Sequence, residues 1–564
     1  MTGGLLQRLS HLCRRSIPSD PAFERAVVRL DRDVGPSTLL AGVYGTLGVG
    51  GLAAAVAWRF VGPVALAAVA GCSALAALVL YAGPLWLAAT RRAQTLGEAP
   101  ELVAMAVLSL HAVPSLEEAA GFATRHGRGH LADSLREHVR RSRGTPATGW
   151  TAFATHWRDA EPALARAADL LVAAVDASPA DRDQLLDRAL GTILDETESQ
   201  LATFAADLRG PVTALYAFGV VLPLALIATL PAARSAGVAV PPTALAVLYD
   251  LGLPALLGVA VAWVLARRPV AFRSAAVAQS HPALPRWRLG APVAGLAAGI
   301  TAWVVAGQTG LGWIRPISGA GLAVGVTLVS WYEPVRQVRQ HGDAVEAGLP
   351  DALSLAGRRL RRGRPPETAV ESVGASLDGP TGDVFESAAR NSAVLGVDVE
   401  TAFTGDRGAL ADVPSPRTAA AASLLALAGR HGGEAGETVI HIADHVADLA
   451  RVESEGRREL ATIAGTLRST ACCFGPLVGG ATVALADRIG GVPQSTAVTA
   501  PLSTATLGLI VGWYVLVLAA LLATFAAALD NGVDRQRIGY AAGVAISGAA
   551  ISYPASFALA ASVT

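Results

Sequence analysis

Two histidines spaced one helical turn apart form the most metal-like pattern in the sequence. His441 and His445 stand in the stretch HIADH, and a separation of four residues places both on one face of a helix. A zinc site needs at least one further protein ligand, and neither an HExxH motif nor a third ligand lies near them in the chain. We therefore interpret the pair as part of a polar helix face, and we expect no metal site and no cofactor.

A dense group of arginines occupies the stretch RRLRRGR: Arg358, Arg359, Arg361, Arg362 and Arg364. Such a positive surface suits an acidic protein partner or anionic lipid headgroups. It also suits a solvated helix end, because cations are favoured near the C-terminus of a helix. The run is denser than a helix end requires, so we hypothesise that it is a binding surface for a partner or for headgroups.

Asp250 is a single acid inside a long apolar run. A carboxylate at the middle of a bilayer costs about 2.5–3.5 kcal/mol on insertion scales, so its position invites a functional interpretation. An isolated acid does not suffice for a proton relay. We interpret Asp250 as paired with Tyr249 or a neighbouring helix, or as partly wetted.

The other reactive residue types argue against an enzyme. The 45 basic residues are all arginine, and a chain without lysine has neither a P-loop lysine nor a Schiff-base lysine. Four cysteines lack a CxxC spacing, and no GxSxG elbow occurs. We therefore expect no catalytic residues.

The elements that carry these residues belong to a membrane protein. Of the 564 residues, 52% are hydrophobic and only 16% are charged, against about 25% charged in an average soluble domain. Several apolar runs exceed the roughly 18 residues that mark a transmembrane helix. The sequence predicts an all-α, polytopic membrane protein with about nine spans.

The predicted order alternates pairs of spans with polar segments. It comprises an N-terminal segment (1–36), spans one and two (37–90), a first helical domain (91–209), spans three and four (210–266), a basic link (267–288), spans five and six (289–332), a second helical domain (333–468), spans seven and eight (469–530) and span nine (538–564).

Arginine placement predicts the orientation. The N-terminal segment holds six arginines and the link five, and Arg535 and Arg537 precede the last span, whereas the opposite connections are nearly bare. Since positive loops stay inside, we expect a multi-pass cell-membrane protein with a cytoplasmic N-terminus, two cytoplasmic helical domains and an external C-terminus. Arg209 and Arg468 would then lie at the inner membrane interface, with their guanidinium groups among the headgroups.

The chain also contains matching segments in the same order. LATFAADLRG from Leu201 returns as LATIAGTLRS from Leu460, Pro100 matches Pro350, and Tyr249 matches Tyr514. These matches predict a duplicated unit of two spans, a helical domain and two spans. Because four spans is an even number, the two copies would be parallel repeats.

The two helical domains differ in charge at matching positions. The uncharged VLSLHAV of the first domain stands where the second has its arginines, so the domains should not share one partner surface. Acids outnumber arginines 17 to 12 in residues 91–208 and 20 to 14 in residues 333–467, which argues against nucleic acid as a partner.

Local sequence predicts how the helices begin and end. Pro350 suits a first helical turn, while Gly363 and Pro365 end that helix as Pro114 does in the first domain. The helix after Asp181 is predicted to run straight into span three.

The repeated motifs resemble a known family. PELVAMA and PDALSLA, followed by HAVPSLEEA and RRGRPPETA, resemble the type II secretion system F domain, and the stretch Tyr249–Pro269 is similar to its archaeal branch. The resemblance covers most of residues 90–530. It implies an integral membrane platform for a type IV pilus-like filament: a pilus, an archaellum or a related secretion machine.

The resemblance also implies the partners. A separate cytoplasmic hexameric ATPase would dock on the helical domains, here at the arginine-rich stretch, and its motion would lift pilin-like subunits from the membrane. A chain that cannot bind nucleotide through a P-loop lysine agrees with an engine on another chain.

Two other functions stay open on sequence grounds. A transporter with parallel repeats should place polar or interrupted helices at the bilayer midplane in both halves, but the spans here are nearly uncharged. A membrane enzyme ranks third, since no catalytic constellation is visible. Small residues such as Gly479 and Gly480 would allow close helix approach, either within the chain or in a homodimer.

Overall fold

The structure is a computed structural model that describes residues 43–46, 48, 51–52, 97–111, 113–127, 129–142, 148–159, 161–235, 240–268, 277, 281–431, 435–490 and 503–563. These residues form helices and connections and include no strand. The predicted all-α class is therefore confirmed for this part of the chain. The predicted N-terminal segment, nearly all of spans one and two, and half of the basic link lie outside the described residues.

Seven of the described helices are long and apolar enough to cross a membrane. They are Pro179–Ala233, Pro242–Ala266, Trp287–Gln308, Ile314–Arg361, Gly436–Ile489, Thr504–Asp530 and Arg535–Ser562. Each contains one of the predicted spans three to nine. The protein is thus built as a multi-pass membrane protein, and a total of nine spans stays a prediction.

The surface of the apolar helices fits a lipid environment. On α13 (Ala291–Gln308), Val293 is 71% exposed and Leu296 is 61% exposed. The opposite face packs against α14 (Ile314–Ala347), where a Cβ at Gly299 would lie 2.7 Å from the Gly319 carbonyl oxygen. Lipid favours such an exposed apolar face, whereas water would make it a liability.

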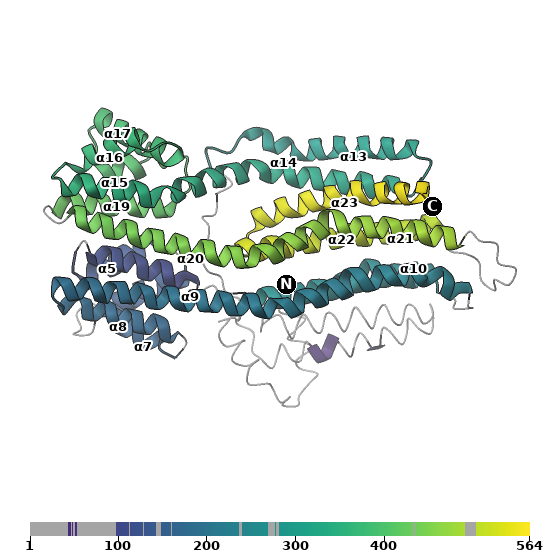
Figure 1. Cartoon of the computed structure of the whole chain (residues 1–564), viewed down its shortest axis with the longest axis horizontal. Helices are drawn as coiled ribbons and strands as arrows, with labels where there is room; N and C mark the ends of the chain where they lie inside the picture. Colours follow the sequence, from purple (N-terminus) through teal and green to yellow (C-terminus); the bar gives the residue numbers. More distant parts are fainter. Residues whose placement is uncertain are drawn as a thin grey trace.

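Two regions of shorter helices lie together at one end of the elongated molecule, and the apolar helices make up the other end (Figure 1). The first region has a helix over residues 97–111, α5 (Leu116–His126), α6 (His130–Ser142), α7 (Gly149–Trp157), α8 (Pro162–Asp176) and the start of α9 (Pro179–Tyr216). The second has α15 (Leu349–Arg361), α16 (Pro366–Ser376), α17 (Pro380–Leu395), α18 (Val399–Thr404), α19 (Pro416–His431) and the start of α20 (Ala435–Ser469).

The helix boundaries follow the predicted signals. Pro350 lies in the first turn of α15, and Gly363 adopts a φ of +74° directly after that helix, where residues other than glycine are strained. Pro114 follows the end of the helix over 97–111. Ser178 caps α9 by accepting a hydrogen bond from the Asp181 backbone N–H.

The two regions share one hydrophobic core. Its buried residues include Trp150 and Phe153 of the first region and Phe385 and Phe403 of the second, whose ring centroids lie 5.0 Å apart. The regions therefore behave as one helical bundle, and we call this combined unit the bundle.

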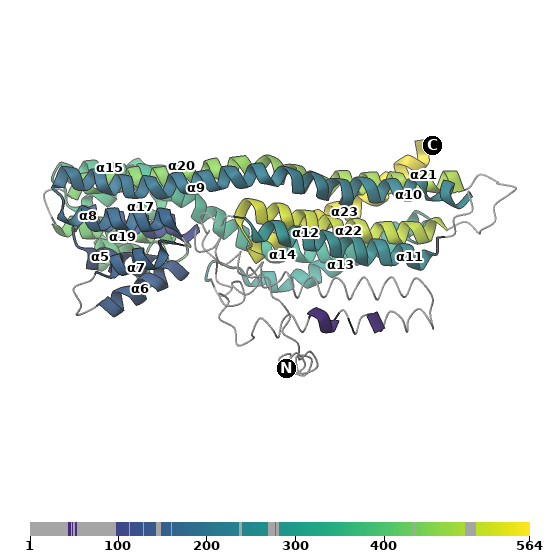
Figure 2. The same cartoon turned by 90° about the horizontal axis from the view of Figure 1, so that it is seen from below.

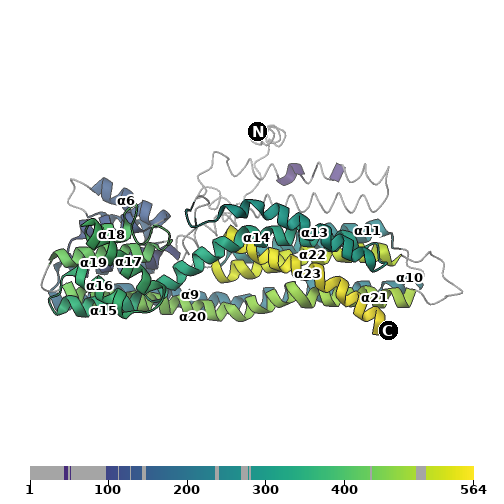
Figure 3. The same ribbon diagram turned by 90° about the horizontal axis from the view of Figure 1, so that it is seen from above.

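Two long helices connect the bundle to the apolar helices. α9 continues through the π segment η1 (Ala217–Val221) into α10 (Leu222–Ser235), as predicted for the helix after Asp181. α20 continues through η4 (Thr470–Phe474) into α21 (Gly475–Gly490). Figures 2 and 3 show both helices running the length of the molecule.

α9 and α20 pack side by side in a parallel direction. Asp187 contacts His445 near the bundle end, Leu201 packs on Gly456 further along, and the Tyr216 hydroxyl is hydrogen-bonded to the Thr470 hydroxyl at the far end. The matching segments LATFAADLRG and LATIAGTLRS lie within α9 and α20, where Leu208 and Leu467 are buried. Their repeated leucines therefore serve helix packing.

α22 (Thr504–Asn531) lies among several of the apolar helices. It contacts α12 (Leu253–Ala266), α20, α21 and α23 (Arg535–Val563). α11 (Pro242–Ala246) and the π segment η2 (Val247–Gly252) precede α12, and the short η3 (Arg286–Gly290) precedes α13. A Cβ at Gly480 would lie 2.3 Å from the Tyr553 carbonyl oxygen, so this glycine serves packing within the chain.

Candidate functional site

The junction between the bundle and the apolar helices contains buried polar and charged side chains. Arg339 of α14 is only 5% exposed, forms an ion pair with Asp534, and donates from Nη2 to Gln536 Oε1 at 2.6 Å. Asp534 and Gln536 lie where α22 ends and α23 begins. A buried guanidinium is tolerated only when it is paired in this way, so the contact fixes α14 against that turn.

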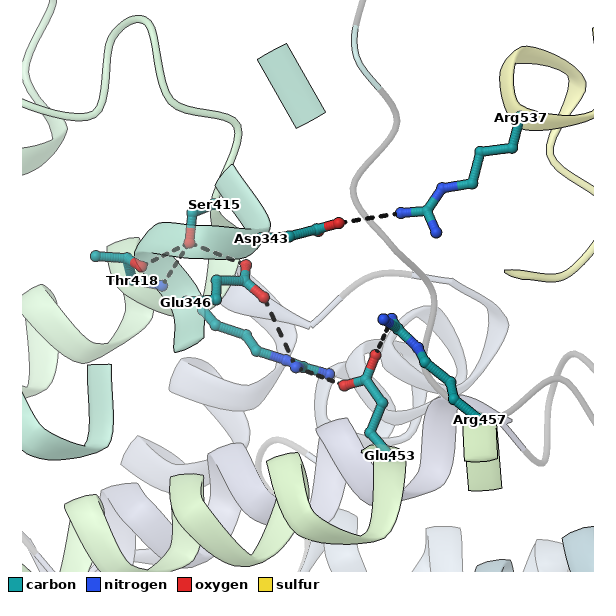
Figure 4. A network of polar contacts seen from close by, with 8 residues as sticks. Asp343, Glu346, Ser415, Thr418, Glu453, Arg457 and Arg537 are labelled. Carbon is teal, nitrogen blue, oxygen red and sulfur yellow. Dashed lines mark hydrogen bonds and ion pairs between the residues drawn. The ribbon is translucent and has the colours of Figure 1, made fainter. Parts of the chain in front are cut away.

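A second ion pair joins the same helices. Arg537 of α23 lies 3.3 Å from Asp343 of α14, one helical turn beyond Arg339 (Figure 4). Gln536 also donates to the Val277 carbonyl oxygen at 2.8 Å. The start of α23 is therefore held by polar contacts on several sides.

A network around Glu346 and Glu453, the two carboxylates that pair with Arg417 of α19, continues the junction into the bundle (Figure 4). Arg417 Nη1 lies 2.8 Å from Glu453 of α20 and 3.7 Å from Glu346 of α14, and the Ser415 hydroxyl donates to Glu346 at 2.9 Å. Arg457 pairs with the second oxygen of Glu453. The network thus joins α14, α19 and α20.

Burial dominates the electrostatics of Glu346. It raises the pKa of this carboxyl above its usual range, although Arg417 and the Ser415 hydrogen bond act in the opposite direction. Burial also opposes the charge of Arg417, but Glu453 and then Glu346 raise the pKa of that guanidinium. The distances reconcile the two results, because Glu453 is the closer partner of Arg417 and Glu346 is the weaker one.

Two further arginines tie helices to the end of α22. Arg268, which follows α12 and is 6% exposed, donates from Nε to the Leu529 carbonyl oxygen at 2.9 Å. Arg468 forms an ion pair with Asp530. We call these contacts, with those of Arg339, Arg537 and Arg417, the charged junction.

The charged junction borders two cavities. One of about 310 Å³ is lined by residues that include Asp343, Glu346 and Arg457, and one of about 430 Å³ is lined by residues that include Arg336, Arg468 and Tyr540. Their carboxylates and guanidinium groups are largely engaged with each other. This arrangement holds helices together and leaves packing space around the contacts.

The two predicted interface arginines lie at similar places on the long helices. Arg209 is exposed on α9 next to the buried Leu208, and Arg468 is half exposed at the end of α20, directly before η4. Both therefore precede the apolar continuation of their helix. Their contact with headgroups stays a prediction.

The arginine-rich stretch lies at the opposite end of the bundle. Arg358, Arg361, Arg362 and Arg364 are exposed and Arg359 is half-buried. Within the described part of the chain, their side chains form no hydrogen bond or ion pair. A Cβ at Gly436 would lie 2.2 Å from Arg361 N, which places the stretch beside the start of α20, farthest from the apolar helices.

The two histidines of HIADH do not form a solvated face. His445 is only 5% exposed, and its Nε2 lies 3.2 Å from Asp187 Oδ1. The ring of His111, at the end of the helix over 97–111, lies 5.3 Å from His445 and stacks parallel on His441 at 5.3 Å. His445 therefore lies on a polar part of α20 that is buried, because α20 packs on the first region there.

The side chain of Asp250 is exposed, which agrees with the partly wetted arrangement among those considered. The Tyr249 hydroxyl donates to the Pro223 carbonyl oxygen at 2.6 Å and its ring lies edge-on to Tyr514, while the Asp250 side chain is exposed on η2. The expected pairing with Tyr249 is therefore not formed.

Comparisons with known proteins supply no relative. No protein-family model matches the sequence, and searches among curated proteins and solved structures return no significant match. The resemblance to the type II secretion system F domain therefore rests on the motifs quoted above.

Sequence reasoning missed the charged junction. The local sequence around Arg537 indicates only membrane orientation, and nothing in it marks Arg339 and Asp534 as a pair. Their position at the ends of apolar helices was visible, but the pairing joins residues 195 positions apart.

Proposed function

We propose that this protein is the membrane platform of a type IV pilus-like filament or secretion machine, which couples a cytoplasmic ATPase to the extrusion of pilin-like subunits. The observation that carries the proposal is the parallel pair of α9 and α20. Each helix runs without a break in helical structure from the bundle into an apolar helix. A force applied to the bundle would therefore reach the membrane along two packed, stiff elements.

The charged junction supports the same role. An α-helix can transmit displacement only if its lateral neighbours hold it, and paired charges at a buried site fix relative helix positions. Arg339, Arg417 and Arg468 attach α14, α19 and α20 to each other or to α22 and α23. Motion of the bundle would thus displace several apolar helices together.

We propose the arginine-rich stretch as the docking surface for the ATPase. The 34 residues from Gly436 to Ser469 span about 50 Å at 1.5 Å per residue, so the stretch lies far from any headgroups at the apolar end of α20. Electrostatic attraction is screened beyond about 8 Å at physiological salt. This distance favours an acidic protein partner over lipid.

We also infer that the chain contains two parallel repeats with both helical regions in the cytoplasm, the N-terminus inside and the C-terminus outside. The similar order of helices in the two regions supports the duplication. So does the meeting of the matched residues Tyr249 and Tyr514, whose ring centroids lie 5.4 Å apart. A homodimer is compatible with this arrangement.

One observation favours the transporter alternative. The π segments η1, η2 and η4 interrupt regular α-helix within apolar helices of both halves, and π segments are frequent at functional sites. The helices nevertheless stay continuous through these segments, in contrast to the broken helices of many transporters.

The decisive experiment deletes the gene in its native host and images surface filaments. Loss of filaments, restored by the wild-type gene, supports the platform, whereas normal filaments with a defect in solute uptake would support the transporter. Topology reporters near residues 150 and 400 provide an independent check. Signals from opposite sides of the membrane would overturn the proposed arrangement.

A further inference from the structure

Five side chains from three helices meet where the first region packs on the second. His111 ends the helix over 97–111, Asp183 and Asp187 lie one turn apart on α9, and His441 and His445 lie one turn apart on α20. Facing helices that each present residues four apart can build a metal site inside a helical bundle. The platform role uses none of these five residues.

The ligand atoms are close and partly unsatisfied. One atom each from His111, Asp187 and His445 lies within 4.8 Å of the others. The His111 side chain is 3% exposed, yet its Nε2 has no hydrogen-bond partner within the described structure, while Nε2 of the buried His445 faces Asp187 Oδ1 at 3.2 Å. Buried polar atoms without a partner are uncommon and call for an explanation.

The surroundings of His111 resemble the outer shell of a metal ligand. Its Nδ1 lies 3.4 Å from Asp183 Oδ1, while the opposite nitrogen, Nε2, is the unsatisfied one. A histidine that binds zinc through one nitrogen commonly donates the other N–H to a carboxylate, which fixes the ring and its tautomer.

We propose that His111, Asp187 and His445 bind one zinc ion, with Asp183 orienting His111 and His441 adjacent to the site, so that the metal fastens the first helical region to the second. Imidazole nitrogen with a single carboxylate is a typical zinc donor set, whereas calcium and magnesium require oxygen ligands. The inference is independent of the platform role.

The geometry requires only a small adjustment. Ligand atoms at about 2.0–2.2 Å from a tetrahedral zinc lie roughly 3.3 Å from one another. The present spread of up to 4.8 Å would close by roughly 1.5 Å, to which the Asp187 side chain can contribute because it is 61% exposed. A water or His441 would complete the tetrahedron.

Zinc binding by the purified full-length chain in detergent tests the proposal. After treatment with a chelator, competition with a fluorescent zinc indicator should show one ion per chain. We expect His111→Gln and His445→Gln to weaken the affinity at least about 100-fold and Asp183→Asn about 10-fold. Cobalt substitution should give the strong visible absorption of a tetrahedral site, and His445→Gln should abolish it.

His138→Gln is the matched control. His138 and His156 also form a close histidine pair within the first region, with ring centroids 5.2 Å apart. Among the described residues, however, no third ligand joins this pair in a group that could hold a metal. The control should bind zinc as the wild type does. Asp187→Asn provides a variant whose exposed position spares the fold, and it should lose most of the affinity.

Two results would overturn the site. One is a folded wild-type protein that shows no saturable zinc binding. The other is binding of equal affinity in the wild type, Asp187→Asn and His111→Gln, which would place the metal elsewhere on the chain.

Discussion

The two helical regions use helices in the same order but place their first helix in different environments. Residues 102–110 of the first region are all buried, with at most 6% exposure, whereas α15 of the second region exposes Asp351, Arg358 and Arg361. A helix that is apolar on every side belongs in the interior, and one with a charged face belongs at a surface. Equivalent positions thus serve as core in one region and as a contact surface in the other.

This difference indicates a division of tasks. The first region supplies interior surface to the bundle and contributes His111 to the cluster with α20. The second carries the arginine-rich stretch and is continuous with α14, whose ion pairs reach α23. We therefore expect the proposed docking surface to lie on the second region.

Exchanging the residue types at one matched pair of positions should have the largest effect on the free energy of unfolding. Leu108 is 3% exposed and matches the exposed Arg358. We expect Leu108→Arg to cost more than 4 kcal/mol and to prevent folding, because it buries an unpaired charge. Arg358→Leu should change the free energy of unfolding by less than about 0.5 kcal/mol.

Expression level and thermal unfolding of the purified variants in detergent measure both effects. A well-folded Leu108→Arg protein would mean that the helix over 97–111 is not the interior helix of the bundle.

The charged junction should be the next most sensitive place. Arg339→Ala leaves Asp534 without its ion-pair partner, and we expect a loss of about 3–5 kcal/mol because the pair is buried. Arg336→Ala is the matched control on the same helix. Its pair with Glu333 is 44% and 29% exposed, so the loss should stay below about 1 kcal/mol.

Unfolding in a denaturing detergent, followed by tryptophan fluorescence, measures the two variants side by side. Equal losses would show that burial does not distinguish the two ion pairs, and the role of Arg339 as an anchor would be rejected.

Charge reversal in the arginine-rich stretch should affect binding and spare stability. Arg361→Glu with Arg362→Glu should weaken association with the secretion ATPase at least tenfold, because like charges would then face an acidic partner. Since both side chains are exposed and unpaired within the described structure, the free energy of unfolding should change by less than about 0.5 kcal/mol.

The adjacent pair Arg140 and Arg141 provides the control in the first region, where both lie exposed at the end of α6. Their reversal to glutamate should leave ATPase binding unchanged in a pull-down with the full-length chain. Comparable losses for both pairs would indicate a general charge effect and contradict a docking surface on the second region alone.

Local physics made the helices predictable. Long apolar runs identified the positions of the seven described membrane helices, and Pro350 and Gly363 marked the ends of α15 because their backbone preferences act within a few residues. The pairing of α9 with α20 was not predicted, since matching sequence indicates a shared structure but does not say that the copies touch.

Contacts between residues far apart in the chain could not be predicted from the sequence for a related reason. The spacing of His441 and His445 suits a ligand pair, but the histidine that lies beside them, His111, is more than 300 positions earlier in the chain. Arg339 and Asp534 each look like an ordinary helix-end charge. Only the packing of distant helices brings such residues together, and the spacing of residues within one segment does not predict that packing.

The smallest effect that we predict concerns the pH dependence of Glu346. Burial raises the pKa of Glu346 above its ordinary value of 4.5. At a pH between the ordinary and the raised pKa, Glu346 is therefore protonated in the folded state and ionised in the unfolded state. The free energy of unfolding therefore falls as pH rises through this window, by at most about 1.4 kcal/mol for each unit of pKa shift. Glu346→Gln should remove this slope, so that the variant gains stability relative to the wild type as the pH approaches 7.

Glu453→Gln should instead lose stability at pH 7, because it removes the closest carboxylate of the buried Arg417. Unfolding curves at a series of pH values from 4 to 7 distinguish the two, and a destabilised Glu346→Gln at pH 7 would mean that the attraction of Arg417 outweighs burial at Glu346.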